Sequence, residues 1–296
     1  MSSTSSITSS IPASASPRRR SALLSHLRRN PLVAVGALLV LAWVILGLVA
    51  PLIAPYDPLR QNVSNRMRPP YADHIMGTDE LGRDVFSRVL YGARVTIPAG
   101  LTVILFGTVI GTLVGAVAGF IGGWIDEAIM RVTELFMAFP TIILAMAISA
   151  ALGPDVRNAI LALVVVWWPN YARLMRGLVL EIKSKEFVEG ARAVGATGPY
   201  ILFRTILPNC IAPAIVLGTL DVGNAILTFA GLSFLGLGPE PSAADWGRMV
   251  SSGVDNLNQW WTWLFAGLGI ASVVLGCNFI GDGLRDFLDP RLRKGN

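Results

Sequence analysis

One acidic side chain lies deep inside an apolar stretch of this sequence. Asp221, in VLGTLDVGNAILTF, is the only charged residue between Arg204 and Glu240. A charged Asp near the centre of a membrane helix costs about 2.5–3.5 kcal/mol, so its carboxyl is expected to face protein or water. In one interpretation it accepts hydrogen bonds from a neighbouring helix, of this chain or of a partner. In the other it lines a passage and contacts a cationic group, with Asn224 one turn on sharing that face.

Residues that commonly carry enzyme or metal chemistry form no recognised pattern. The sequence contains no G-x-x-x-x-G-K-[ST], G-x-S-x-G or H-E-x-x-H motif. Cys210 and Cys277 lie in or beside apolar stretches without CxxC spacing, which favours small core side chains. His26 and His74 are too far apart in sequence to suggest a ligand pair. We therefore predict no catalytic group, no metal site and no cofactor bound by this chain.

A second polar segment, EFVEGARAVGATGPYILFRTILPN at residues 186–209, interrupts the apolar sequence. Four apolar side chains recur in it with the spacing of one helical face: Phe187, Val188, Ala191 and Val194. Gly195 can end that helix. Pro199 fits the first turn of a second short helix, and Pro208 fits the entry to the next long one. The pattern predicts a helix, a turn and a helix, with a solvated connecting loop as the alternative.

The elements that position these residues are expected to cross a membrane. Of the 296 residues 53% are hydrophobic and 15% charged, and mean hydropathy is +0.59, which is rare in soluble domains. A helix needs roughly 20 apolar residues to cross about 30 Å of hydrocarbon. We predict an all-α integral membrane protein with six transmembrane helices, near residues 31–54, 95–123, 128–152, 158–180, 209–237 and 260–281.

Basic residues indicate the orientation of these helices. They gather in the N-terminal tail, between residues 173 and 204, and at the C-terminus, and such loops stay in the cytoplasm. The 55–94 loop also carries six Arg, but five acids accompany them. Both termini and residues 181–208 are therefore predicted to be cytoplasmic. Since the basic residues flank membrane helices, the net charge of +5 does not indicate nucleic-acid binding.

Residues 1–30 and 31–296 differ in character. The first are Ser-rich and basic, without hydrophobic periodicity, and are predicted to form a disordered cytoplasmic tail. The rest are predicted to form one transmembrane domain. A cleaved signal peptide is the rival interpretation of residues 31–54, but that stretch exceeds an h-region of 7–15 residues. Four glycines spaced four apart predict close helix packing: Gly107, Gly111, Gly115 and Gly119.

Part of the 186–209 segment resembles the EAA loop of ABC importer permeases, whose pattern is E-A-A-x3-G-x9-I-x-L-P. The matching residues are Glu189, Gly190, Ala191, Gly195, Leu207 and Pro208. Gly190 replaces the first Ala, which weakens the helix by about 1 kcal/mol, and Thr205 replaces Ile. Three further stretches, HIMGTDELGRDVFSRVLYGAR, FAGLSFLGLGPEPSAADWG and NFIGDGLRDFLDP, resemble the C-type permeases of dipeptide, oligopeptide and nickel importers.

The resemblance implies the ABC importer permease fold with an EAA-type coupling loop at residues 181–208, in a bacterial or archaeal plasma membrane. It implies a homologous second permease, two ATP-binding subunits that hold ATP and Mg, and an extracytoplasmic substrate-binding protein. This chain would form half of the translocation pathway. The expected ATPase-coupling residues are Glu186, Phe187, Glu189, Gly190, Ala191, Val194, Gly195, Leu207 and Pro208.

Peptides are the first expectation for the substrate, and their amino terminus would then be the cationic group near Asp221. Nickel chelates and other small solutes remain alternatives. An ion-coupled secondary transporter and a membrane-embedded enzyme are less favoured, because each needs more ionisable residues inside the membrane.

The loops at 55–71 and 239–246 are expected to face a binding protein outside the membrane. Between them, residues 78–80 could begin a helix, since their acids suit a first turn. An apolar stripe would follow: Val85, Phe86, Val89 and Leu90. We predict an interfacial helix at 82–92, lying along the membrane before the second span. The alternative is that this segment only packs against its own bundle.

Overall fold

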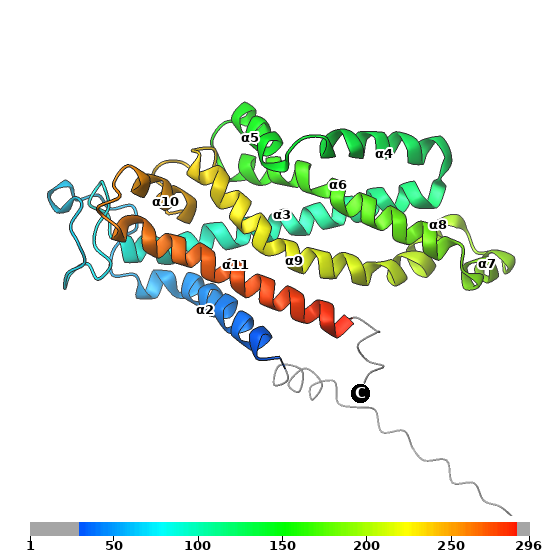
Figure 1. Cartoon of the computed structure of the whole chain (residues 1–296), viewed down its shortest axis with the longest axis horizontal. Helices are drawn as coiled ribbons and strands as arrows, with labels where there is room; N and C mark the ends of the chain where they lie inside the picture. Colours follow the sequence, from blue (N-terminus) through cyan, green and yellow to red (C-terminus); the bar gives the residue numbers. More distant parts are fainter. Residues whose placement is uncertain (1–29, 289–296) are drawn as a thin grey trace, which may run out of the picture.

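The computed structural model describes residues 30–288, and this part of the chain is a bundle of helices without regular strands (Figure 1). The elements are α2 (Pro31–Ile53), a 3₁₀ turn (Val63–Asn65), α3 (Val85–Ile121), α4 (Gly123–Met137), α5 (Thr141–Leu152), α6 (Val156–Lys183), α7 (Glu186–Ala193), α8 (Gly198–Tyr200), a π turn (Ile201–Ile206), α9 (Leu207–Phe234), α10 (Trp246–Val254) and α11 (Trp261–Leu288). The predicted tail at residues 1–30 lies outside the described residues, apart from its last one.

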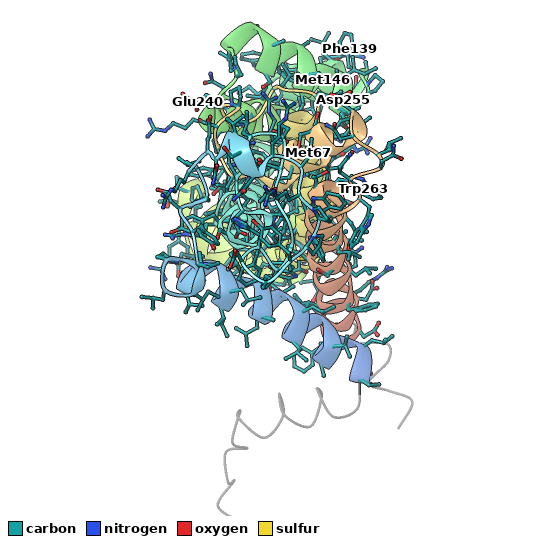
Figure 2. All side chains as sticks on the ribbon, turned by 90° about the vertical axis from the view of Figure 1, so that its left-hand side faces the viewer. Met67, Phe139, Met146, Glu240, Asp255 and Trp263 are labelled. Carbon is teal, nitrogen blue, oxygen red and sulfur yellow. The ribbon has the colours of Figure 1, made fainter. Side chains whose placement is uncertain are left out.

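The long helices run between two ends of the molecule. The 54–84 loop and α10 lie at one end, and α7 and α8 lie at the other (Figure 1). Seen from the first end, α2 follows one side of the bundle, and α5, where Met146 is labelled, follows the opposite side (Figure 2). The predicted coupling segment and the predicted outer loops are therefore at opposite ends.

Four helical segments are long and apolar enough to cross a membrane: α2, α3, residues 198–234 and α11. The pair α4 and α5 would count as a fifth span, bent by 89°. The stretch predicted as a span at 128–152 is therefore two helices with a sharp bend between them. Pro140 lies between the two helices, where its ring disfavours helical geometry at Phe139 and it has no N–H to donate.

α6 occupies the position of the predicted fourth span. At 28 residues it is long enough to cross a membrane, since each residue adds about 1.5 Å. It is not among the helices apolar enough to count as spans, because it carries seven strongly polar residues: Arg157, Asn158, Asn170, Arg173, Arg176, Glu181 and Lys183. The described residues thus supply four clearly apolar spans, a bent pair that would count as a fifth, and one long polar-faced helix at the position of the predicted fourth span.

The pairing of α3 with α6 depends on the glycine ridge. A Cβ added at Gly111 would lie 2.9 Å from the backbone nitrogen of Ala172, and one at Gly115 would lie 2.8 Å from its carbonyl carbon. At Gly119 the corresponding distance is 2.9 Å, to the carbonyl oxygen of Arg176. Real Cβ atoms do not approach backbone this closely. The prediction that these glycines bring two helix backbones together is confirmed.

The predicted interfacial helix at 82–92 is wrong, because α3 runs unbroken from Val85 to Ile121. Its N-cap is Asp84, whose Oδ2 accepts a hydrogen bond from the Ser87 amide at 2.7 Å. In the predicted apolar stripe, Val85 and Val89 pack in one buried cluster with this chain's own Trp246 and Trp261. Leu90 is also buried, and Phe86 is half-buried. Packing against its own bundle, the alternative interpretation, therefore describes these residues.

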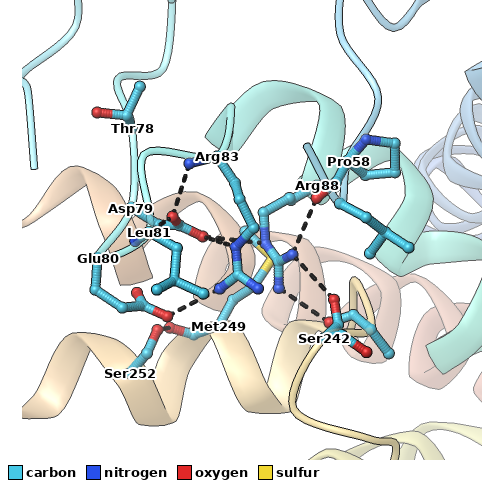
Figure 3. Close-up of polar contacts among 12 residues, drawn as sticks. Pro58, Thr78, Asp79, Glu80, Leu81, Arg83, Arg88, Ser242, Met249 and Ser252 are labelled. Carbon is cyan, nitrogen blue, oxygen red and sulfur yellow. Dashed lines mark hydrogen bonds and ion pairs between the residues drawn. The ribbon is translucent and has the colours of Figure 1, made fainter. Parts of the chain in front are cut away.

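Arg88 joins the outer loops to α3, and its side chain is almost completely buried. Figure 3 shows its guanidinium reaching the loop carbonyls, and it donates to the oxygens of Pro58 (3.1 Å), Ser242 (3.4 Å) and Ala243 (2.9 Å). Its Nε lies 3.4 Å from Asp79 Oδ2. One buried cation on α3 thus holds a loop 30 residues before it and another loop 155 residues after it in sequence.

Asp245 makes a similar link at the start of α10. Its Oδ2 accepts from the Arg248 amide and its Oδ1 from the Thr96 hydroxyl on α3, both at 3.0 Å. Burial raises the pKa of Asp245, and these hydrogen bonds oppose that rise by favouring the charged form. The outer end is therefore a well-connected cap over the bundle.

Candidate functional site

The coupling segment begins with α7, an eight-residue helix from Glu186 to Ala193. Gly195 follows it with φ +84°, a left-handed conformation that a β-branched residue adopts only under strain. The Gly195 amide donates to Arg192 and the Ala196 amide to Ala191, at 2.9 and 3.0 Å, which closes the end of the helix. The prediction that Gly195 ends this helix is confirmed.

The predicted apolar face of α7 is only partly buried. Val188 is fully buried, and it packs in a cluster with Met175 and Ile206. Ala191 packs against the same cluster. Phe187 is 51% exposed and Val194 is 85% exposed, so packing within this chain covers only part of the predicted apolar face. α7 is held by one side and presents two large apolar side chains to its surroundings.

The rest of the predicted coupling residues surround this surface. Glu186, Glu189 and Gly190 are exposed on α7, and no atom lies within 4 Å of a Cβ added at Gly190. Leu207 and Pro208 form the first turn of α9, with Leu207 half-buried and Pro208 exposed. Packing within this chain therefore does not require glycine at 190.

The second half of the segment departs from a simple helix. Pro199 lies in the first turn of α8, as predicted, but α8 has only three residues and continues through the π turn Ile201–Ile206 into α9. A π turn often occurs where regular i to i−4 bonding is disturbed, and Pro208, which has no N–H, lies two residues after its end. At the start of the segment, Lys183 Nζ donates to the carbonyl oxygen of Phe120 at 2.5 Å, which ties α6 to the end of α3.

Asp221 lies in the middle of α9, and its Oδ2 accepts a hydrogen bond of 2.9 Å from the Tyr171 hydroxyl on α6. The expected hydrogen bond from a neighbouring helix is thus present within this chain. Asp221 also borders a hollow of about 460 Å³, which we call the Asp221 hollow. Its lining residues are Thr141, Ile142, Trp167, Asn170, Asp221, Asn224, Leu227 and Thr228. Asn224 is exposed on the same side, so the two predicted residues share a face.

A second hollow, of about 400 Å³, lies further along α6 and is called the Arg176 hollow. Arg176 makes two hydrogen bonds of 2.6 Å to the carboxylate of Asp126 on α4. Arg173 lines the same hollow and is exposed. Trp167 and Asn170 line the first hollow, and Arg173 and Arg176 line the second, so the two follow one another on successive turns of one helix.

Three features of this site were not predicted from the sequence: the Tyr171 partner of Asp221, the Asp126–Arg176 pair and the buried Arg88. Each joins helices or loops at least 30 residues apart, so no short spacing carries the signal. Within residues 30–288 no cluster of three potential metal ligands occurs. His74 instead lies 2.8 Å from Asp84, and His26 is outside the described residues.

Comparison with known proteins places this arrangement in a family. Residues 111–294 match the family described as "Binding-protein-dependent transport system inner membrane component", and residues 20–70 match the N-terminal TM domain of oligopeptide transport permease C. The first match covers more than half of the chain. The chain belongs to the binding-protein-dependent permease family. The predicted family and its all-α permease fold are confirmed.

Several relatives of this permease have been named. It is 41% identical over 269 residues to the dipeptide transport system permease protein DppC of Alkalihalophilus pseudofirmus, which covers 90% of this chain and 88% of the relative. It is 42% identical over 276 residues to DppC of Escherichia coli K12, covering 91% and 92%. A chain of the inward-facing MetNI methionine ABC transporter superposes with a TM-score of 0.56 at 20% identity, covering 68% of this permease and 97% of that chain. At that identity the likeness concerns the fold alone.

Proposed function

We propose that this permease forms half of the translocation pathway of an ATP-driven importer of dipeptides and oligopeptides. The observation that carries the substrate class is the identity of 41–42% to two dipeptide permeases along about nine tenths of both chains. The pathway itself is supported by the two polar hollows on α6, because polar surface at this depth needs water or protein opposite it.

The proposed coupling site is the exposed surface of α7. Phe187 and Val194 would insert into a cleft of an ATP-binding subunit, and Gly195 would give the chain its sharp exit. Two such subunits would hold ATP and Mg, and this chain would bind no cofactor and catalyse no reaction. Movement of α7 would reach the pathway through α6 and through the π turn that continues into α9, since Val188 packs in one cluster with Met175 and Ile206.

The remaining partners follow from the two ends of the molecule. A homologous second permease would face the α4, α6 and α9 hollows and complete the pathway. A substrate-binding protein outside the membrane would meet the 55–71 and 239–246 loops. Both termini and α7 would be cytoplasmic, as the basic residues indicate, in a bacterial or archaeal plasma membrane.

Reconstitution of the whole importer tests this function. The permease, its cognate second permease, the ATP-binding subunits and the binding protein are placed in proteoliposomes, and accumulation of a radiolabelled dipeptide is measured with and without ATP. We expect ATP-dependent accumulation that a nickel chelate in excess does not compete away. Accumulation of the chelate in place of the peptide would refute the substrate class. Uptake driven by an ion gradient without ATP would refute the importer class.

A further inference from the structure

Only one of the two carboxylate oxygens of Asp221 accepts a hydrogen bond from the described residues. Its Oδ2 accepts the Tyr171 hydroxyl, and no residue among 30–288 donates a hydrogen bond to Oδ1. Oδ1 is also absent from the buried polar atoms that lack a partner, so it is accessible from the hollow. Across the described helices no Lys, Arg or His forms an ion pair with this acid. A single negative charge thus faces the hollow without a counter-charge from this part of the chain.

The walls of the Asp221 hollow supply polar groups and no cation. Two amides, of Asn170 and Asn224, and two hydroxyls, of Thr141 and Thr228, line it together with the indole of Trp167. Amide oxygens accept hydrogen bonds from an ammonium group, and an aromatic face attracts a cation. The remaining lining is apolar, from Ile142 and Leu227. This combination of one acid, neutral acceptors and an aromatic ring is complementary to a small organic cation.

Tyr171 fixes the direction of the carboxylate. Its side chain is fully buried on α6, in the core that also contains Val103 and Phe229. Because its ring is held by packing, its hydroxyl holds one oxygen of Asp221 and leaves the other for the hollow. Tyr171 is a positioning residue in this arrangement, and Asp221 is the group that would touch a ligand.

We propose that Asp221 is a binding site for an ammonium group in transit, which in a peptide substrate is the free amino terminus. The inference rests on the proposed peptide import and adds the requirement that the transported molecule carries an ammonium group. A charge-assisted hydrogen bond from the ammonium to Oδ1 would offset the cost of placing an acid at this depth. An inorganic metal ion fits less well, since no group of three carboxylates, imidazoles or thiols occurs among the described residues.

The test uses the complete importer in proteoliposomes, with the binding protein saturated by a dipeptide. Asp221→Asn keeps the size and the Tyr171 contact but removes the charge, and we expect peptide turnover to fall about tenfold, as a charge-assisted bond becomes a neutral one. Copurification of all subunits shows whether the variant importer has assembled. Asp221→Glu should restore most of the turnover. Tyr171→Phe should raise the KM for the loaded binding protein or lower turnover less than Asp221→Asn does.

A second pair of variants leaves Asp221 in place and covers the case in which Asp221→Asn does not assemble. Asn170→Lys brings an ammonium into the same hollow, so it should pair with Asp221 and slow peptide turnover about tenfold. Asn170→Gln keeps a neutral amide in the hollow and is the comparison variant, which should be slowed less than Asn170→Lys. Equal rates for these two variants, or more than half of the wild-type rate in an assembled Asp221→Asn importer, would overturn the inference. Absence of dipeptide uptake by the wild type would instead overturn the proposed function.

Discussion

Gly115→Ala is the substitution that most directly tests how α3 and α6 are held together. The new Cβ would lie 2.8 Å from both the carbonyl carbon and the Cα of Ala172 and would also meet its carbonyl oxygen. Comfortable carbon contacts are about 3.5–4.0 Å, so the two helices must separate by about 1 Å. Overpacking of this kind costs about 1–3 kcal/mol, whereas Ala gains at most about 1 kcal/mol in helix propensity. We therefore expect net destabilisation.

Two other glycines provide matched controls. A Cβ at Gly107 would lie 3.2 Å from Trp167 Cβ, which requires a shift of only a few tenths of an ångström, and a Cβ at Gly177 on α6 has no atom within 4 Å. Gly107→Ala should therefore cost less than Gly115→Ala, and Gly177→Ala should be neutral or slightly stabilising. Thermal unfolding of the purified variants ranks their stabilities, since each kcal/mol shifts the unfolding temperature by about 2–4 °C. Equal unfolding temperatures for Gly115→Ala and Gly177→Ala would refute the argument that backbone contact fixes this helix pair.

Three further predictions concern the two ends of the molecule. Gly195→Val forces a β-branched residue into φ +84°, so ATP hydrolysis should become uncoupled from uptake while membrane insertion survives; normal transport would contradict this. Arg88→Met leaves buried loop carbonyls and Asp79 without their cation, so thermal unfolding should show a loss of about 3–5 kcal/mol in stability. The exposed Arg94→Gln should not lower stability, and equal unfolding temperatures for the two variants would contradict the prediction. Cysteines placed at the exposed Arg68 and Ser242 should react with a membrane-impermeant thiol reagent added to intact cells. The background should be low because Cys210 and Cys277 are buried. Protection of both positions would overturn the predicted orientation.

Several elements could be predicted from the sequence because their signals are local. The first span needs only an uninterrupted apolar run, and α2 at Pro31–Ile53 agrees with residues 31–54 to within one residue. The glycine ridge needs only a spacing of four, since that spacing places small residues on one side of a helix. Gly195 could be placed at the end of α7 because glycine alone adopts a left-handed turn without strain. Pro140 is an equally local signal for the bend between α4 and α5. It lies inside a stretch without charged residues, and that stretch suggests one continuous span.

Tertiary structure alone decided which surfaces meet. The periodicity of residues 186–194 describes one helix, but the cluster around Met175 covers Val188 and leaves Phe187 and Val194 exposed. The sequence showed that Asp221 needs a polar neighbour, because burying an acid in lipid is costly. That the neighbour is Tyr171, 50 residues away, depends on how closely the glycines of α3 let α6 approach and on where α9 then packs. Local periodicity determines a helix and its faces, whereas the choice of partner for each face is a packing outcome of the whole bundle.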